Sequence, residues 1–184
     1  NMDVLSGKFT FTGLDNYKRM IDSGYFFKSI LNTLLIWIMS IIPQLTIAFI
    51  LSLILSNKWF RGKFILRNLY YFPNLVTPVT IGLLFGALFS YPGGAVNNII
   101  TMLGLEAVDF QNHQMLARIV IAIAICWKNF GFNIIYFTAG INSISDEVME
   151  AAEVDGASAW QRITKITIPL MKPILIYVMV TSII

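Results

Sequence analysis

Two long stretches without a charged side chain constrain this chain more than any other feature. No Asp, Glu, Lys or Arg occurs between Lys28 and Lys58, or between Arg67 and Glu106. A helix rises about 1.5 Å per residue, so roughly 20 apolar residues cross the hydrocarbon core of a bilayer. Both stretches exceed that length. With 57% apolar and only 12% charged residues, the chain departs from the composition of a soluble domain. We therefore predict an integral membrane protein.

Hydropathy along the chain predicts an all-α, polytopic helical bundle. Pro73 and Pro78 predict a broken or kinked start to the second span, because each proline lacks a backbone donor. Gly82 and Gly86 form a GxxxG pattern, which allows a neighbouring helix to approach closely. Residues 9–27 suit a short helix at the membrane interface, followed by an aromatic belt. The predicted spans are residues 29–55, 69–89, 116–141 and 173–184, the last one incomplete.

The distribution of basic residues predicts the topology. Lys58, Arg61 and Lys63 share a short loop without an acidic residue, which is typical of the cytoplasmic side. The loop around His113 has little positive charge and is expected outside, and residues 142–172 return to the inside. The N-terminal segment then starts outside, although it lacks the features of a signal peptide. We expect the chain to be a fragment of a subunit with about six spans.

Several kinds of chemistry find no support in the sequence. His113 is the only histidine and has no cysteine nearby, so a metal site is not expected. Cys126 is the only cysteine and excludes an internal disulfide. The basic residues form no broad patch among aromatics, which argues against nucleic-acid binding. No G-x-x-x-x-G-K-[ST] phosphate loop occurs, and nothing places a nucleophile beside a base. We predict that the chain is not an enzyme and binds no cofactor itself.

The polar segment after the third span predicts a helix, a tight turn and a second helix. Ser145 is a candidate cap for the first helix, and Gly156 suits the left-handed conformation that ends it. Ser158 and Gln161 form a capping box for the second helix, and Pro169 bends the chain back toward the membrane. An amphipathic helix on the membrane surface is the alternative. With five acids and three bases from residue 146 to 172, binding to anionic lipid is disfavoured, and docking to a protein is favoured.

The same segment resembles the EAA motif of ABC importer permeases. Its residues are Glu150-Ala151-Ala152, Gly156, Ile166 and Ile168-Pro169. Ile168 replaces the usual Leu, which is a mild change. The chain resembles the carbohydrate-uptake branch of these permeases along nearly all of its length, including Phe11 to Tyr17, Asn32-Thr33, Arg61-Gly62-Lys63, Phe72-Pro73, Gly93-Gly94 with Asn97, and Trp127.

This resemblance implies a fold and a mechanism. The fold is that of a type I ABC importer permease, with one transmembrane domain over residues 1–184 and a cytoplasmic coupling loop at 142–172. The implied partners are an ATPase dimer that binds ATP-Mg, a second permease subunit and an extracytoplasmic solute-binding protein. Glu150 and Asp155 would contact the ATPase, and Gly156 would shape the turn. The implied coupling residues are Glu150, Ala151, Ala152, Asp155, Gly156, Ala157, Ile166 and Pro169.

Polar residues inside the spans are candidates for the solute path. Lys128 near the middle of the third span is costly in a bilayer. It would hydrogen-bond the solute, pair with a carboxylate of the second permease subunit, or extend its ammonium toward the interface. Trp127 provides a stacking face for a sugar or packs against lipid, and the asparagines bind solute or tie helices together. The full candidate set is Trp127, Lys128, Asn129, Asn133, Tyr136, Gln44 and Asn74.

The resemblance implies a multi-pass subunit of a bacterial cell membrane that imports a sugar or oligosaccharide. Glycerol 3-phosphate or another polyol is the alternative solute, since Lys128 would suit an anion. An ion-coupled secondary transporter, which needs no ATPase, is the alternative of a different class.

Overall fold

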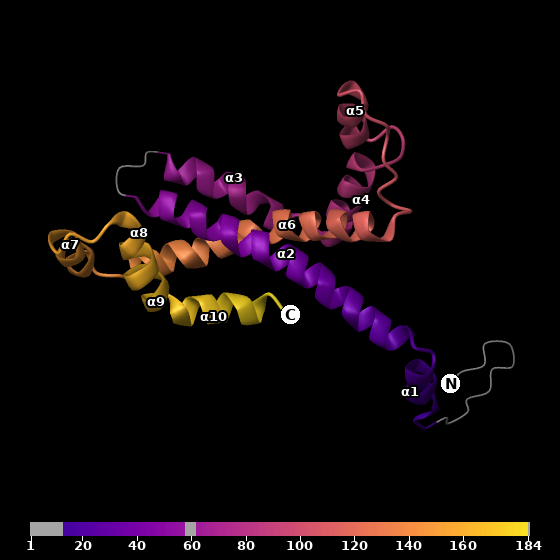
Figure 1. The fold of residues 1–184 in the computed structure, drawn as a ribbon, viewed down its shortest axis with the longest axis horizontal. Coiled ribbons are helices and arrows are strands. Elements are labelled where there is room, and N and C mark those ends of the chain that lie inside the picture. The colour runs from indigo at the N-terminus through magenta and orange to yellow at the C-terminus, as the bar shows by residue number, and fades with distance from the viewer. Residues whose placement is uncertain (1–12, 58–61, 184) are drawn as a thin grey trace, which may run out of the picture. The chain divides into compact units, whose positions relative to one another are not determined.

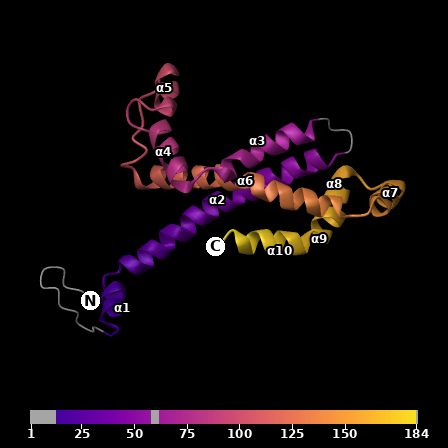
Figure 2. The same cartoon turned by 180° about the vertical axis from the view of Figure 1, so that it is seen from behind.

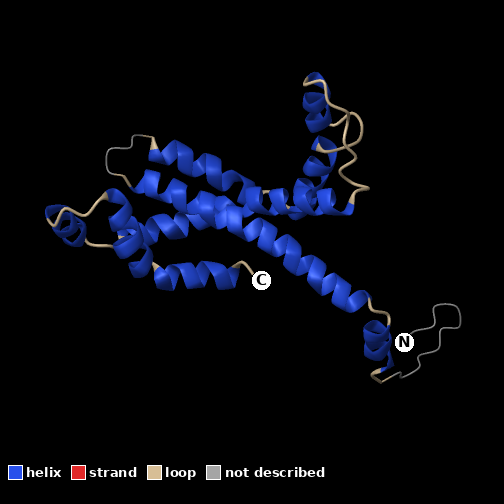
Figure 3. Cartoon of the chain, in the orientation of Figure 1, coloured by secondary structure: helices blue, strands red, loops and turns tan. Residues whose placement is uncertain are grey.

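The computed structural model describes residues 13–57 and 62–183, apart from the side chains of Phe64 and Arg67. These residues form helices and connecting loops, with no strand among them (Figure 3). The chain divides into two compact units, residues 1–36 and 37–184. The elements are α1 (Asp15–Asp22), α2 (Tyr25–Ser56), α3 (Lys63–Leu75), α4 (Pro78–Leu88), α5 (Ala95–Met102), α6 (Gln114–Asn142), α7 (Asp146–Val154), α8 (Ala159–Arg162), η1 (Ile163–Thr167), α9 (Ile168–Leu170) and α10 (Lys172–Thr181).

The first unit holds α1 and the start of α2. Leu14, Tyr17 and Ile21 are exposed at helical spacing, as suits a helix whose apolar side faces a membrane interface. The predicted interface segment is helical from residue 15 to 22, and its residues 9–12 lie outside the described part. The aromatic residues at 25–27 form the first turn of α2.

Helix α6 organises the second unit. It contacts α3, α4 and α10, and Figures 1 and 2 show α3 running alongside it. A buried apolar core joins α2 and α6 to the chain around α10, which removes the facing sides of these helices from solvent or lipid. The core residues are Ala48, Leu55, Ile134, Phe137, Met171 and Val178.

A close approach of backbones fixes the contact between α3 and α6. Gly131 of α6 is buried, and a Cβ atom at this position would overlap the backbone carbonyl of Tyr70 in α3. The absence of a side chain therefore lets the two helices touch, as small residues do between membrane helices. By contrast, no atom lies within 4 Å of a Cβ built on Gly82 or Gly86. Within the described residues, the predicted GxxxG pattern brings no helix close.

Two helices, α2 and α6, are long and apolar enough to cross a bilayer alone. They cover residues 25–56 and 114–142, slightly more than the spans predicted there. Two further pairs of helices meet the same test only when each pair is taken together, with bends of 102° (residues 68–75 and 78–88) and 65° (residues 159–170 and 172–181). The described chain thus has two to four candidate spans.

The predicted span at residues 69–89 is divided between two helices, in agreement with the broken or kinked entry that the prolines predict. Helix α3 ends at Leu75 and α4 begins at Pro78. Pro78 has no backbone N–H to continue the helical ladder, and Thr77 caps α4 through a hydrogen bond from the backbone N–H of Thr80 at 3.3 Å. The prolines do predict a break, but its angle depends on the packing of α4 against α6.

The segment between α4 and α6 is tied together by one buried amide. The side chain of Asn97 is fully buried and donates to the carbonyls of Ser90 and Val108, both at 3.0 Å. Its oxygen accepts from the backbone N–H of Val108 at 2.8 Å. Further along, the side-chain amide of Asn112 donates to the Asp109 carboxylate at 2.8 Å. Hydrogen bonds from Asn112 hold the pKa of Asp109 below its usual range.

Candidate functional site

The segment from α7 to η1 forms an elbow at one end of the second unit (Figure 1). Asp146 and Arg162 of the elbow line a cavity of about 980 Å³ together with Ser56, Asn57 and Lys63. The elbow therefore lies at the same end as the loop between α2 and α3, which carries the predicted cytoplasmic basic residues. Of that loop, Lys58 and Arg61 lie outside the described residues.

The turn of the elbow is a complete Schellman motif. Gly156 has φ 79°, the left-handed conformation that glycine adopts without a Cβ penalty. The N–H of Gly156 donates to the carbonyl of Glu153, and the N–H of Ala157 donates to the carbonyl of Ala152 at 2.9 Å. These bonds satisfy carbonyls at the end of α7. The helix end predicted at Gly156 is confirmed.

The caps of the two elbow helices differ from each other. At α8 the predicted capping box is confirmed, since Ser158 Oγ accepts from the N–H of Gln161 and the Gln161 side chain accepts from the N–H of Ser158 at 2.8 Å. At α7 the predicted Ser145 cap is wrong, because its side chain makes no capping hydrogen bond. Asp146 and Glu147 occupy the first turn, where negative charge favours the helix dipole.

The residues of the EAA motif on the elbow are exposed or half-buried. Glu150, Ala151, Asp155 and Gly156 are exposed, and neither carboxylate forms an ion pair within the described residues. Ala152, Ala157 and Ile166 are half-buried, and Pro169 is exposed just before the 65° bend into α10. The exposed side chains of the motif are thus available to a partner.

Two features of the elbow were not foreseen from the sequence. Glu153 and Arg162 form an ion pair between α7 and α8. Residues Ile163–Thr167 form a π-helical turn, in which the buried Thr167 donates through its hydroxyl to the carbonyl of Arg162 at 3.3 Å. Glu153 and Arg162 are nine residues apart in the sequence. They come into contact because the Gly156 turn folds one helix back on the other.

Lys128 of α6 contacts the break between α3 and α4. Its ammonium donates to the backbone carbonyls of Asn74 at 3.1 Å and Val76 at 3.2 Å. Of the predicted path residues, Lys128 and Asn74 are thus brought together, although Asn74 takes part through its backbone. Lys128 is half-buried within a 29-residue helix.

The other predicted path residues do not converge on one cavity. Trp127 packs its ring against Phe85, with centroids 5.8 Å apart, and Asn129 donates to the carbonyl of Ile125 in its own helix. Successive positions on a helix point about 100° apart, so 127, 128 and 129 face different neighbours. Gln44 and Asn133 are both buried, and the Asn133 side-chain nitrogen has no hydrogen-bond partner within the described part.

Tyr136 has a partner that the sequence did not reveal. Its hydroxyl lies 3.4 Å from that of Tyr177 in α10, and the ring centroids are 5.1 Å apart. The side chains of Tyr136 and Tyr177 remain partly accessible. The pair offers two aromatic faces and two hydroxyl groups on neighbouring helices.

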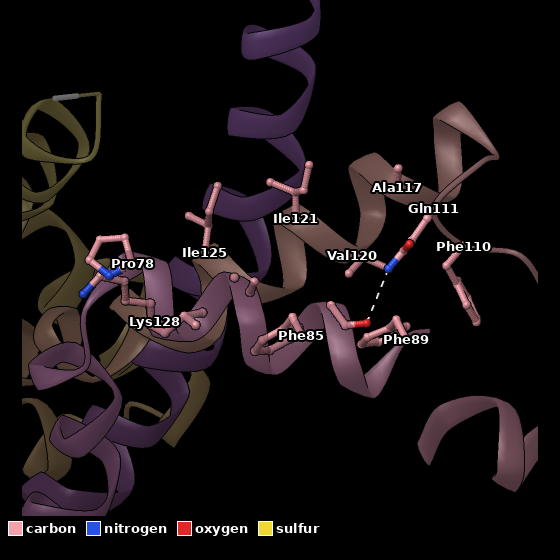
Figure 4. A pocket seen from close by; sticks show the side chains of 14 residues that line it. Pro78, Phe85, Phe89, Phe110, Gln111, Ala117, Val120, Ile121, Ile125 and Lys128 are labelled. Atoms are coloured by element: carbon pink, nitrogen blue, oxygen red, sulfur yellow. Dashed lines mark hydrogen bonds between the residues drawn. The ribbon is translucent and has the colours of Figure 1, made fainter. Parts of the chain in front are cut away.

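An apolar pocket of about 440 Å³ separates α4 from the N-terminal half of α6 (Figure 4). Phe85 and Phe89 stack along its wall, and Phe110 lies edge-on to Phe89. At one end Gln111 donates to the carbonyl of Gly86 at 3.4 Å. Lys128 and Pro78 lie together at the other end, so polar groups are confined to the two ends.

A family model covers residues 23–184 of this arrangement, described as the inner membrane component of binding-protein-dependent transport systems. The chain belongs to this family of transport permeases. The family predicted from the EAA motif is confirmed, and a membrane permease subunit agrees with the prediction that the chain is not an enzyme.

Relatives of this permease chain act in sugar transport systems. It is 30% identical to an arabinooligosaccharides transport system permease protein of Halalkalibacterium halodurans over 98% of this chain and 57% of the relative. It is also 30% identical to a lactose transport system permease protein of Rhizobium radiobacter over 94% of this chain and 58% of the relative. The permease chain thus spans somewhat more than half of the length of these relatives.

Solved structures match the fold of this permease chain as well. A chain of a bacterial alginate ABC transporter, in complex with an alginate pentasaccharide-bound periplasmic protein, has a TM-score of 0.82 at 29% identity. The match covers 92% of this chain and 59% of the other. The predicted fold class, a helical bundle of the ABC importer permease kind, is confirmed.

Proposed function

We propose that the chain is part of the membrane-spanning subunit of a bacterial ABC importer, and that it couples passage of a sugar or oligosaccharide to ATP hydrolysis by a separate ATPase. The proposal includes a multi-pass location in the cell membrane, a second permease subunit and an extracytoplasmic solute-binding protein. ATP-Mg belongs to the ATPase, and the chain itself supplies the coupling elbow and part of the path.

The exposed elbow carries the proposal. Glu150 and Asp155 are exposed at the end of the bundle where the basic loop predicts the cytoplasm. The Schellman turn at Gly156 gives the elbow a defined shape, and the Glu153–Arg162 pair joins its two helices. A rigid, charged projection of this kind is suited to dock in a cleft of a soluble protein. The family match favours this function over ion-coupled transport.

The solute class rests on the relatives and on exposed aromatic groups. The similar permeases belong to transport systems for arabinooligosaccharides, lactose and alginate. Tyr136 and Tyr177 present rings and hydroxyls from α6 and α10, which suits stacking and hydrogen bonding to a sugar. We place this pair on the solute path together with Asn133, whose buried amide nitrogen lacks a partner among the described residues.

A pull-down of the full-length, tagged subunit tests the coupling function. We expect an ATPase, identified by its phosphate-loop peptides, to co-purify. Glu150→Lys should reduce its recovery by about tenfold or more, because a charge placed against a like charge in an interface is strongly unfavourable. Glu106→Lys is the matched control, since Glu106 is exposed in the loop before α6. Equal recovery with both variants would contradict the proposed docking surface.

The solute is tested with the purified complex and its binding protein. We expect an oligosaccharide to stimulate ATP hydrolysis and glycerol 3-phosphate to have no effect. Stimulation by glycerol 3-phosphate alone would favour the alternative solute, and ATP-independent uptake would favour the alternative class.

A further inference from the structure

Lys128 occupies the centre of α6, where a charged side chain is costly in a bilayer. Its ammonium nevertheless has two acceptors, the carbonyls of Asn74 and Val76, at 3.1 and 3.2 Å. Both acceptors are backbone carbonyls at the break between α3 and α4, and neither is a carboxylate.

The geometry of the break explains why these two carbonyls need a donor. In a continuous helix, the carbonyl of Asn74 would accept from the N–H of residue 78, but residue 78 is proline and has none. The carbonyl of Val76 would accept from the N–H of Thr80, which instead donates to Thr77 Oγ1. Lipid offers no donor to either carbonyl.

The charge of Lys128 suits this position as well. The break follows the C-terminus of the 13-residue helix α3, where the helix dipole is negative and a cation is stabilised. The Lys128 side chain thus donates hydrogen bonds to two otherwise unpaired carbonyls and places a positive charge at the negative end of the α3 dipole.

We propose that Lys128 is a positioning residue for transport, which holds the α3–α4 break against α6. The three helices then respond together when the elbow at the far end of α6 is displaced. This proposal rests on the proposed transport function, but it differs from the reading in which Lys128 binds the solute.

The surroundings of Lys128 argue against solute contact. The pocket beside it is lined by aromatic and aliphatic side chains from α4 and α6 (Figure 4). Its other polar side chain, Gln111, donates to the carbonyl of Gly86 at the opposite end. A sugar at the Lys128 end would find few hydrogen-bonding groups.

The test uses the full transporter with Lys128→Met and Lys128→Arg. Lys128→Met should lower the maximal uptake rate about tenfold, since two carbonyls lose their donor, while the KM for solute changes less than twofold. Lys128→Arg should retain most of the rate. Cys126→Ala, two positions earlier on α6, is the control and should behave as wild type.

Thermal unfolding of the detergent-solubilised subunit provides a readout that needs neither solute nor ATPase. We expect the Lys128→Met variant to unfold at a lower temperature than wild type, and Lys128→Arg, which keeps a donor for the two carbonyls, to unfold close to wild type. If Lys128→Met does not insert, Lys128→Gln, which keeps a donor without the charge, replaces it, and a lowered maximal rate with little change in KM is again expected. A raised KM with an unchanged maximal rate, normal uptake by Lys128→Met, or a Lys128→Arg variant as impaired as Lys128→Met would overturn it. Failure of wild-type uptake to depend on ATP would instead overturn the proposed function.

Discussion

The guanidinium of Arg162 lies 2.6 Å from a carboxylate oxygen of Glu153, and the pair joins α7 to α8 across the Gly156 turn. The Glu153 side chain is 71% exposed and that of Arg162 is 25% exposed. An ion pair this accessible contributes little to stability, about 0–1 kcal/mol. We expect it to help hold the two elbow helices in one relative orientation, beside the backbone bonds of the turn.

Charge exchange tests this role of the pair. We expect Glu153→Arg or Arg162→Glu to weaken solute-stimulated ATP hydrolysis while the subunit still inserts, because each change leaves two like charges at the turn. The double exchange should recover most of the loss, since it restores an opposite-charge pair. Glu147→Gln, in the first turn of α7, is the control. A double exchange no better than either single variant would contradict the prediction.

Gly156→Ala should impair coupling through backbone strain alone. The left-handed conformation costs a non-glycine residue about 1–2 kcal/mol, and nothing lies within 4 Å of the added methyl group. We expect normal insertion and reduced uptake, measured in membrane vesicles. Gly93→Ala adds a methyl group in equally open space without a positive φ and should transport normally. Equal activities would argue against the shaped turn.

Asn97→Ala should loosen the segment between α4 and α6. It removes three hydrogen bonds and leaves the N–H of Val108 without its acceptor, at a cost of about 1–3 kcal/mol for the unpaired group alone. The measurement is the rate of proteolysis at residues 103–113 from the outer side. The exposed Asn98 makes one side-chain bond of 3.4 Å, so Asn98→Ala should leave the rate unchanged. Equal protection of both variants would disprove the role of Asn97.

Gly131→Ala should separate α3 from α6. Its methyl group would overlap the backbone carbonyl of Tyr70, and backbone yields only by shifting a whole helix. We expect a loss of about 1–3 kcal/mol, in the range for overpacking of a core, measured by thermal unfolding of the solubilised subunit. Gly82→Ala meets open space in the described chain and should unfold like wild type. The prediction fails if both variants have the same stability.

Local features of the elbow were predictable because their causes are local. A left-handed glycine, a serine with a glutamine three residues later, and acids in a first turn act through bonds between near neighbours. The hydrogen bond predicted from the Ser145 side chain is absent, because a serine at the start of a helix can form a cap but need not do so. Whether its hydroxyl reaches an N–H depends on its rotamer and on the cavity that it lines.

The intramembrane candidates were less predictable from the sequence. Lys128 was correctly singled out as costly in lipid, but its partners lie 52 and 54 residues away. They are backbone carbonyls, which carry no residue-specific signal. The contact between Tyr177 and Tyr136 was not predicted either, because it depends on how α10 packs against α6.

The sequence by itself determined the membrane character, the helical class, the break near the prolines and the chemistry of the elbow. Each of these follows from the hydrophobicity, hydrogen-bonding capacity or permitted dihedral angles of residues close together in the chain. Only the tertiary structure decided the angle of the break, the approach of α3 to Gly131 and the acceptors of Lys128. These depend on contacts between distant segments, whose geometry is set by the packing of whole helices.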